Sequence, residues 1–134
     1  MTPSELNQIH SAAFTTSRPW SAQEFEELLS NKHTHLFTCA QGFVLVRVIA
    51  GEAELLTIAV HPDAQGKGTG GILMSKWMSS LDADEAFLEV AADNVSAKHL
   101  YARHGFACVA RRSAYYARDV GDPVDAIVMR RALK

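Results

Sequence analysis

The sequence has few of the features that mark secreted, membrane-bound or nucleic-acid-binding proteins. Its 134 residues include only two cysteines, Cys39 and Cys108, which are isolated and predict buried thiols in a reducing compartment. No apolar run approaches the roughly 20 residues that a membrane span needs, and the first residues lack the basic and apolar regions of a signal peptide. The net charge of −2 does not favour direct nucleic-acid binding. We therefore expect a cytoplasmic protein without membrane attachment.

Metal-ligand spacing is also missing. The six histidines form no cluster with cysteine, and the pair His33 and His35 is better explained as exposed polar side chains. We expect no metal. The hydrophobic fraction of 48% and the length predict one globular domain over residues 1–134.

Hydrophobic periodicity predicts an α/β fold with a mixed sheet. Helices are expected over residues 3–14, after Ser21 in a capping box with Glu24, after the glycines near residue 70, and after Asp93 or Asn94 as far as Gly105. Strands are expected over residues 35–40, 43–49, 54–60, 86–90, 106–110 and 125–129, with a polar loop through Tyr115 and Tyr116 before the last.

Residues 54–71 give the strongest local signal. An apolar strand ends at Val60, a turn marked by Pro62 follows, and a glycine-rich loop then opens a helix with an apolar stripe. Closely spaced glycines let the backbone approach a ligand, and the free N–H groups of a helix's first turn favour an anion. The stretch predicts a phosphate-binding loop, with a glycine-rich turn that binds nothing as the alternative.

Spacing distinguishes three types of phosphate loop. The glycines match the dinucleotide pattern Gly66-x-Gly68-x-x-Gly71, with Glu89 downstream, but that pattern needs its first glycine at the strand end, and five residues separate Val60 from Gly66. A P-loop needs Ser or Thr after Gly66-Lys67, where glycine stands. The third pattern is Gln65-x-x-Gly68-x-Gly70 after a strand that ends in Val-x-Pro.

This third pattern resembles the acetyl-CoA pyrophosphate loop of the GNAT (Gcn5-related) N-acetyltransferases. A later run resembles a second GNAT signature, Leu88-Glu89-Val90-x-x-x-Asn94-x-x-Ala97-x-x-x-Tyr101-x-x-x-Gly105-Phe106. Within the superfamily the chain looks most like the RimI-type ribosomal-protein-alanine N-acetyltransferases, over essentially residues 5–130. The matches that indicate this branch are Pro19-Trp20-Ser21, Arg111-Arg112, Tyr115-Tyr116 and Asp125-Ala126-Ile127-x-Met129.

The resemblance implies an enzyme that moves acetyl from acetyl-CoA to the α-amine of a protein N-terminus, alanine of a small-subunit ribosomal protein. The alternatives are transfer to a small-molecule amine (a polyamine, amino acid or antibiotic) and an inactive acyl-CoA-binding sensor. It also implies a mixed, mainly antiparallel sheet flanked by helices, with the first strand of the superfamily expected to be missing. The oligomeric state stays open between monomer and weak dimer.

The resemblance assigns the base to Glu89, with Glu54 on the preceding strand as the rival, and the acid to Tyr101. A phenol with a pKa near 10 stays protonated at neutral pH and can donate to a departing thiolate. The structural alternatives are a solvated strand residue for Glu89 and core packing for Tyr101. Neither cysteine has the context of a nucleophile, so direct attack by the amine is favoured.

Coenzyme and acceptor contacts are likewise implied. The strand residues expected to pair with pantetheine, the loop residues expected at the pyrophosphate, and the helix residues expected beside the coenzyme are Ile58, Ala59, Val60, Gln65, Gly66, Lys67, Gly68, Thr69, Gly70, Gly71, Asn94 and Tyr101. An acceptor groove is expected between Trp20, Tyr115 and Tyr116, with aromatic packing as the alternative. The carboxylates of Asp119, Asp122 and Asp125 are expected to favour basic residues further along an acceptor peptide.

Three positions depart from the RimI-type pattern. Ala91 stands where the branch usually has arginine, Gly71 replaces a commonly basic or polar residue, and one residue is inserted between Arg112 and Tyr115. These departures bear on substrate affinity and peptide register more than on the reaction.

Overall fold

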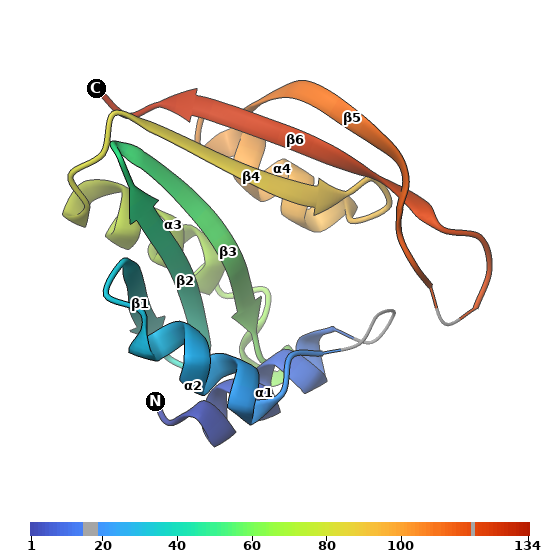
Figure 1. The fold of residues 1–134 in the computed structure, drawn as a ribbon. Helices are drawn as coiled ribbons and strands as arrows, with labels where there is room; N and C mark the ends of the chain where they lie inside the picture. Colours follow the sequence, from blue (N-terminus) through green and yellow to red (C-terminus); the bar gives the residue numbers. More distant parts are fainter. Residues whose placement is uncertain (15–18, 119) are drawn as a thin grey trace.

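A computed structural model describes residues 1–14, 19–118 and 120–134 (Figure 1). Within these residues the chain forms four α-helices, one 3₁₀ helix and a six-stranded sheet. In chain order they are α1 (Pro3–Ala13), α2 (Ala22–Ser30), β1 (Thr34–Cys39), β2 (Gly42–Ile49), β3 (Glu52–Val60), η1 (Pro62–Ala64), α3 (Thr69–Ser80), β4 (Glu85–Ala91), α4 (Val95–Arg103), β5 (Ala107–Tyr116) and β6 (Val124–Ala132).

Local hydrogen bonds set the helix starts. The predicted capping box at α2 is confirmed, because the Ser21 side chain accepts from the Glu24 backbone N–H and the Glu24 carboxylate accepts from the Ser21 N–H. At α4 the cap is Asn94 rather than Asp93, since the Asn94 side chain accepts from the Ala97 N–H at 3.2 Å. The signature residue Asn94 therefore fixes where the helix bearing Tyr101 begins.

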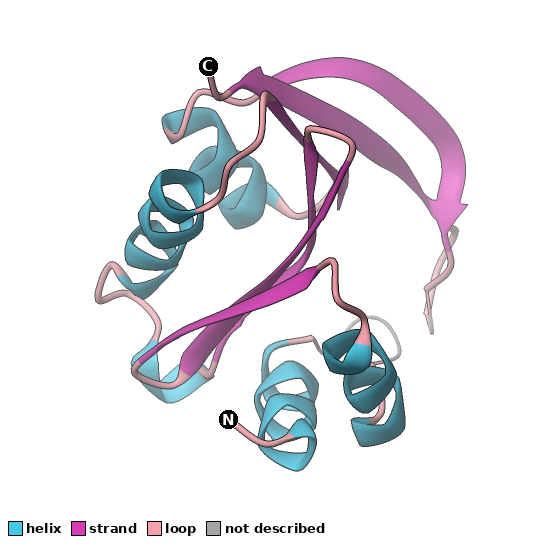
Figure 2. Cartoon of the chain, turned by 60° about the vertical axis from the view of Figure 1, so that its left-hand side comes forward, coloured by secondary structure: helices cyan, strands magenta, loops and turns pink. Residues whose placement is uncertain are grey.

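The helices lie on both faces of the sheet, α1 and α2 on one and α3 and α4 on the other (Figure 2). The larger core packs α3 and α4 on the sheet around the fully buried Trp77. A second core lies under α1 and α2 around the fully buried Phe25. No helix in the described parts of the chain has the length and apolar character needed to cross a membrane.

The sheet has the order β1-β2-β3-β4-β6-β5, and β3–β4 is its one parallel pair within the described residues. That pair covers only Glu52–Glu54 opposite Glu85–Phe87. Beyond these residues the two strands diverge, as Figure 1 shows at the lower end of β3. The predicted α/β class with a mixed, mainly antiparallel sheet is confirmed, and the described residues before α1 contain no strand.

A β-bulge lies just after the parallel pairing ends. Leu45 on β2 pairs with Thr57 and Val46 pairs with Leu55, so Leu56 is the extra residue on β3. The bulge changes which residues of β3 face α3 and α4. Before the bulge the odd-numbered Leu55 packs on that side, and after it the even-numbered Ile58 does. A bulge increases the local twist of its strand, which is consistent with β3 turning away from β4 at this point.

The end of the chain differs from the prediction in one respect. β5 continues to Tyr116 instead of ending near Ala110, so the tyrosine pair ends a strand and does not lie in a loop. The pairing with β6 continues across a second irregularity, in which Ala114 adopts a left-handed φ of 49°. In this bulge residues 113–115 of β5 lie opposite the single residue Asp125 of β6. Because β5 is an edge strand without a covering helix, Cys108 is exposed, and its predicted burial is wrong.

Candidate active site

The loop between η1 and α3 has a backbone suited to an anion. Gly66 and Gly68 have left-handed φ angles of 75° and 81°, and a Cβ at either position would meet no atom within 4 Å. Gly68 is the N-cap of α3, and no side chain accepts a hydrogen bond there from the first turn. The N–H groups of Thr69, Gly70 and Gly71 therefore face an open side at the positive end of the helix dipole. The loop fits the predicted pyrophosphate site.

Other loop residues support this backbone in different ways. The Gln65 side chain donates to the Val60 carbonyl at 2.8 Å and so ties the loop to the end of β3. Gly70 and Gly71 lie within the first turn of α3, because the helix starts at Thr69. A Cβ at Gly70 would lie 3.3 Å from a methyl group of Leu100, so this glycine permits α3 to pack on α4. Lys67 is exposed.

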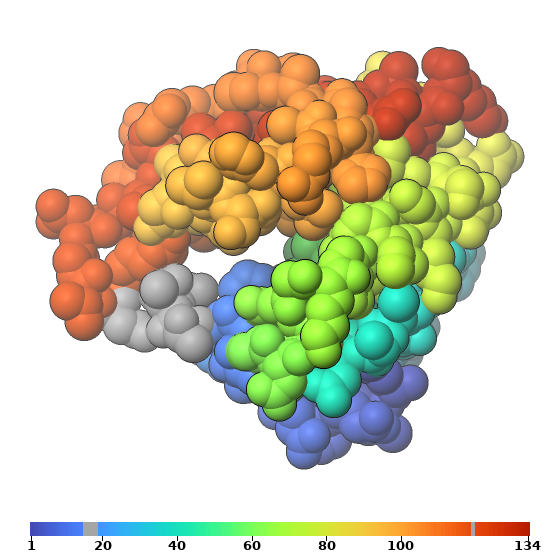
Figure 3. Space-filling view, turned by 180° about the vertical axis from the view of Figure 1, so that it is seen from behind, coloured from blue at the N-terminus to red at the C-terminus, as the bar shows by residue number. Residues whose placement is uncertain are grey.

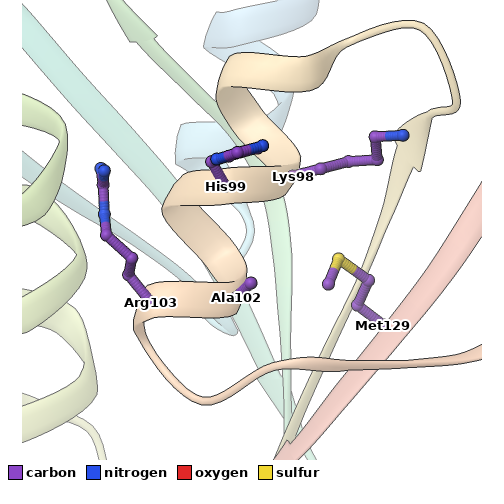
Figure 4. Close-up of a pocket in the computed structure, with 5 residues that line it drawn as sticks. All are labelled: Lys98, His99, Ala102, Arg103 and Met129. Carbon is purple, nitrogen blue, oxygen red and sulfur yellow. The ribbon is translucent and has the colours of Figure 1, made fainter.

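Two hollows lie on the side of the sheet that α3 and α4 cover. One, of about 590 Å³, runs along α3 from the glycine-rich loop and is lined by Gly68, Gly71, Ile72, Ser75, Lys76, Ser79 and His104. The other, of about 550 Å³, lies on α4 and is lined by Lys98, His99, Ala102, Arg103 and Met129 (Figure 4). In Figure 4 Arg103 extends away from Met129, and none of these five is a predicted site residue. The hollow along α3 is therefore the one that adjoins the proposed coenzyme loop.

The diverging strands leave an open position inside the sheet. Ile58, Ala59 and Val60 lie beyond the last parallel pair, so the β4-facing backbone edge of this part of β3 has no strand partner. In the space-filling view the surface is hollowed between the yellow-orange start of α4 and the green glycine loop (Figure 3). An extended ligand can occupy such a position as an added strand, which suits the predicted pairing with pantetheine.

The side chain of Glu89 on β4 and the side chain of Tyr101 on α4 lie on opposite sides of the sheet. Leu88 and Val90 point into the core that Tyr101 shares on α4, so the alternation of the strand turns Glu89 to the other face. Tyr101 is only 5% exposed, and burial raises the pKa of its hydroxyl far above the usual value, with Tyr116 adding to the effect. Tyr101 therefore stays protonated at neutral pH.

Tyr116 is close to both of these groups. It is half-buried at the end of β5, where burial and then the charge of Glu89 raise its pKa to about 12. Its charge also adds to the rise in the pKa of Tyr101, after the larger effect of burial. Tyr115 packs edge-on against Tyr116, with 5.1 Å between ring centroids, and is more exposed. Tyr116 thus has an electrostatic influence from Glu89 and on Tyr101, which lie on opposite sides of β4, and Tyr115 packs beside it.

The two carboxylates considered as the base differ in position. In the pairing between β3 and β4, Glu54 is the last paired residue of β3, and its Oε1 lies 2.6 Å from Nη2 of Arg47 on β2. Glu89 lies two residues beyond Phe87, the last residue of β4 in that pairing. It is at the open part of the sheet, and its side chain is 25% exposed. The geometry favours Glu89.

Trp20 lies with α1 and α2. Its backbone N–H donates to Nδ1 of His10 at 3.1 Å, and its carbonyl accepts from Asn7 at 2.8 Å. Its ring packs beside Phe25, with 5.6 Å between centroids. The predicted groove between Trp20 and the tyrosine pair therefore would have its two walls on different elements, the α1–α2 connection and the end of β5.

The three aspartates expected to face an acceptor have different outcomes. Asp125 accepts from Nε of Arg111 at 2.6 Å and from the Ala114 N–H at 2.8 Å, and these bonds, the Ala114 bond first, lower its pKa. Its carboxylate thus stabilises the β5 bulge, and its contact with an acceptor stays a prediction. Asp122 is exposed, and Asp119 lies outside the described residues.

Comparison with known proteins identifies this arrangement. The model of the acetyltransferase (GNAT) family matches residues 4–106. The chain belongs to the GNAT acetyltransferase family. The predicted family, and the predicted enzyme class of an acetyl-CoA-dependent N-acetyltransferase, are therefore confirmed.

Individual relatives are of the RimI type. The chain is 30% identical to the N-alpha-acetyltransferase RimI of Mycobacterium tuberculosis, over 87% of this chain and 85% of that protein. It is similar to the crystal structure of the ribosomal-protein-S18-alanine N-acetyltransferase from Escherichia coli, with a TM-score of 0.88, 28% identity, and coverage of 98% of this chain and 88% of the other. It also matches the uncharacterized protein ML0378 of Mycobacterium leprae at 29% identity, but its 98% coverage of this chain spans only 39% of that longer protein.

The GNAT fold accounts for the open strand position and the helix N-terminus beside it. Structures that share this fold have been solved with acetyl-CoA. Among the described residues, no three His, Cys, Asp or Glu side chains gather in a group that could hold a metal ion.

Sequence reasoning missed two side chains at this GNAT site. Nη2 of Arg112 lies 3.2 Å from Oε1 of Glu89, and His104 lines the hollow that begins at Gly68. In the sequence, Arg112 stood out only as the second residue of the pair Arg111-Arg112, which resembles the RimI-type enzymes. Nothing local indicated that it reaches a carboxylate on β4, because β5 and β4 are not adjacent strands.

Coenzyme affinity should depend on the open side of Gly68. We expect Gly68→Val to weaken acetyl-CoA binding by more than about tenfold, because a side chain there would block charge-assisted hydrogen bonds worth about 1.5–3 kcal/mol each. Isothermal titration calorimetry measures the loss. Gly121→Val is the matched control, since Gly121 also has a left-handed φ, of 91°, and open space around it, but lies before β6. Equal affinity in both variants would contradict the assignment of the loop.

Proposed function

We propose that residues 1–134 act as one domain that acetylates the α-amine of a protein N-terminus, that of alanine in a small-subunit ribosomal protein. The observation that supports this acceptor is the likeness to the Escherichia coli ribosomal-protein-S18-alanine N-acetyltransferase over 98% of the chain. The tyrosine pair beside Glu89 is a second support, because phenol rings and hydroxyls can line a groove for an extended peptide.

In this proposal three parts of the chain hold acetyl-CoA, which supplies an acetyl group activated as a thioester. The N–H groups of residues 66–71 bind the pyrophosphate at the start of α3. The free edge of β3 at Ile58, Ala59 and Val60 pairs with the extended pantetheine arm. Asn94 caps α4 beside the same opening, and Tyr101 projects from that helix toward the sheet.

Glu89 and Tyr101 then move the protons of a direct transfer. The neutral α-amine attacks the acetyl carbonyl carbon, and Glu89 takes the amine proton, directly or through one water. The bond from the carbonyl carbon to sulfur breaks, and Tyr101 donates its hydroxyl proton to the departing sulfur. A peptide α-amine has a pKa of about 7.7–8.0, so a carboxylate is a sufficient base.

The acceptor assignment is tested by comparing amines. We expect efficient transfer to a peptide that begins with alanine, and little to the same peptide with its α-amine blocked. Thiol release from acetyl-CoA measures the rate, and mass spectrometry locates the acetyl group. Modification of a lysine side chain, or a clear preference for a free polyamine, would contradict the N-terminal acceptor and favour a small-molecule amine.

The acid role of Tyr101 predicts a loss without unfolding. Tyr101→Phe removes one hydroxyl and keeps the buried ring, so we expect kcat to fall by about 10²-fold, the usual contribution of general acid catalysis. The thermal unfolding midpoint is the control for packing. If single-turnover rates match those of the unaltered protein, Tyr101 serves only the core.

The base is identified by a pair of matched substitutions. Glu89→Gln should lower kcat by at least about 10²-fold because it removes the proton acceptor. Glu54→Gln should change kcat by less than about threefold, since Glu54 pairs with Arg47 at the closed end of the β3–β4 pairing and takes no proton in this proposal. If kcat falls more in Glu54→Gln than in Glu89→Gln, Glu54 is the base. Both rates are measured at saturating acetyl-CoA and peptide.

A further inference from the structure

Arg112 is the cation nearest to the proposed base among the ion pairs of the described residues. Its Nη2 lies 3.2 Å from Oε1 of Glu89, with side-chain exposures of 56% and 25%. The strand register explains the contact: Glu89 pairs with Val128 on β6, and Arg112 pairs with Ala126 two residues away, so Arg112 reaches Glu89 diagonally across β6. Both side chains lie on the sheet face opposite the Tyr101 core.

The Arg112 side chain is held from two sides yet remains displaceable. Its guanidinium carbon lies 5.2 Å from the centre of the Tyr115 ring, within the range of a cation–π contact. An ion pair with one partner more than half exposed contributes little to stability, so an arriving acceptor can rearrange it. Arg112 thus lies between the proposed base and the exposed member of the tyrosine pair.

We infer that Arg112 selects the acceptor: it admits an α-amine that is followed by a peptide carbonyl and disfavours polycationic amines. The inference rests on the proposed N-terminal acetylation and specifies how the same site would choose its substrate. Arg112 is a specificity-determining residue in this scheme, and it takes no proton in the reaction.

The first reason is electrostatic. At pH 7.5 roughly a third of a peptide α-amine is neutral, whereas only about one alkyl amine in a thousand is, given pKa values of about 7.7–8.0 and 10.4. The guanidinium of Arg112 beside Glu89 repels an ammonium group. It also repels any further charges carried by the same acceptor within the screening length of about 8–10 Å. Polyamines carry several such charges, so they bear the larger penalty.

The second reason is hydrogen bonding. A guanidinium has five N–H donors in a planar fork, and the contact with Glu89 engages only one edge of it. The remaining donors can bind the carbonyl of an acceptor's first peptide bond, a group that a polyamine lacks. The same side chain can therefore reward a peptide and reject a polycation.

Arg111 provides a control with the same charge on the same strand. Successive residues of a strand point to opposite faces, and Arg111 pairs with Asp125 at 2.6 Å rather than with Glu89. Its exposure of 60% is close to that of Arg112. A change in net charge or in β5 stability should therefore affect both variants, whereas a change in acceptor choice should follow Arg112 alone.

The test compares kcat/KM for an alanine-initiated peptide with kcat/KM for spermidine at saturating acetyl-CoA. We expect Arg112→Gln to lower the peptide-to-spermidine ratio by about tenfold or more, because it removes a like charge that excludes wrong partners. Arg112→Lys, which keeps the charge, should retain most of the selectivity. Arg111→Gln should leave the ratio within about twofold. A merely structural defect would lower both activities together and leave the ratio unchanged.

The outcomes separate the two hypotheses. If the unaltered protein prefers the peptide and Arg112→Gln keeps the same ratio, the selection by Arg112 is wrong and the proposed function stands. If the unaltered protein prefers spermidine, the proposed function is wrong. The inference then fails with it, because a site containing Arg112 would be accepting a polycation. Thermal unfolding midpoints within a few degrees of the unaltered protein establish that the variants are folded.

Discussion

The site depends on a break in the pairing between β3 and β4. The two strands pair only at their first residues, where Glu52 and Glu85 are directly opposite and would repel each other. Arg130 on β6 lies 3.1 Å from one carboxylate and 2.9 Å from the other, and its guanidinium also stacks over Phe87. This residue holds the closed end, while the bulge at Leu56 lets β3 turn away. Unpaired backbone inside a sheet is costly unless water or a ligand satisfies it, so the opening suits an extended ligand.

The pleat of β4 then separates the two groups proposed to transfer protons. Tyr101 belongs to the core under α4, and Glu89 is turned to the opposite face by strand alternation. A substrate that passes between β3 and β4 can meet the acid from one side and the base from the other. The end of β5 places Tyr116 within the electrostatic influence of Glu89, just after the bulge in which Asp125 accepts from the Ala114 N–H.

Most of the element order followed from short-range patterns. Capping boxes, the Asn94 cap and the glycine positions depend on hydrogen bonds or φ angles within a few residues, so their chemistry is visible in the sequence. The two GNAT signatures then gave the family and, through it, Glu89 and Tyr101 as candidates. The error at β5 arose because a polar, exposed edge strand has no apolar alternation, and only its pairing with β6 identifies it as a strand.

What the sequence by itself determined was local: the starts of α1 and α2, the glycine-rich loop before α3, and the residue types needed for acetyl transfer. The tertiary structure alone decided which of these groups meet. The divergence of β3 from β4, the engagement of Asp125 by Arg111, and the contact between Arg112 and Glu89 all depend on strand register across residues far apart in the chain. Register is set by the packing of whole strands and by bulges, and no single motif encodes it.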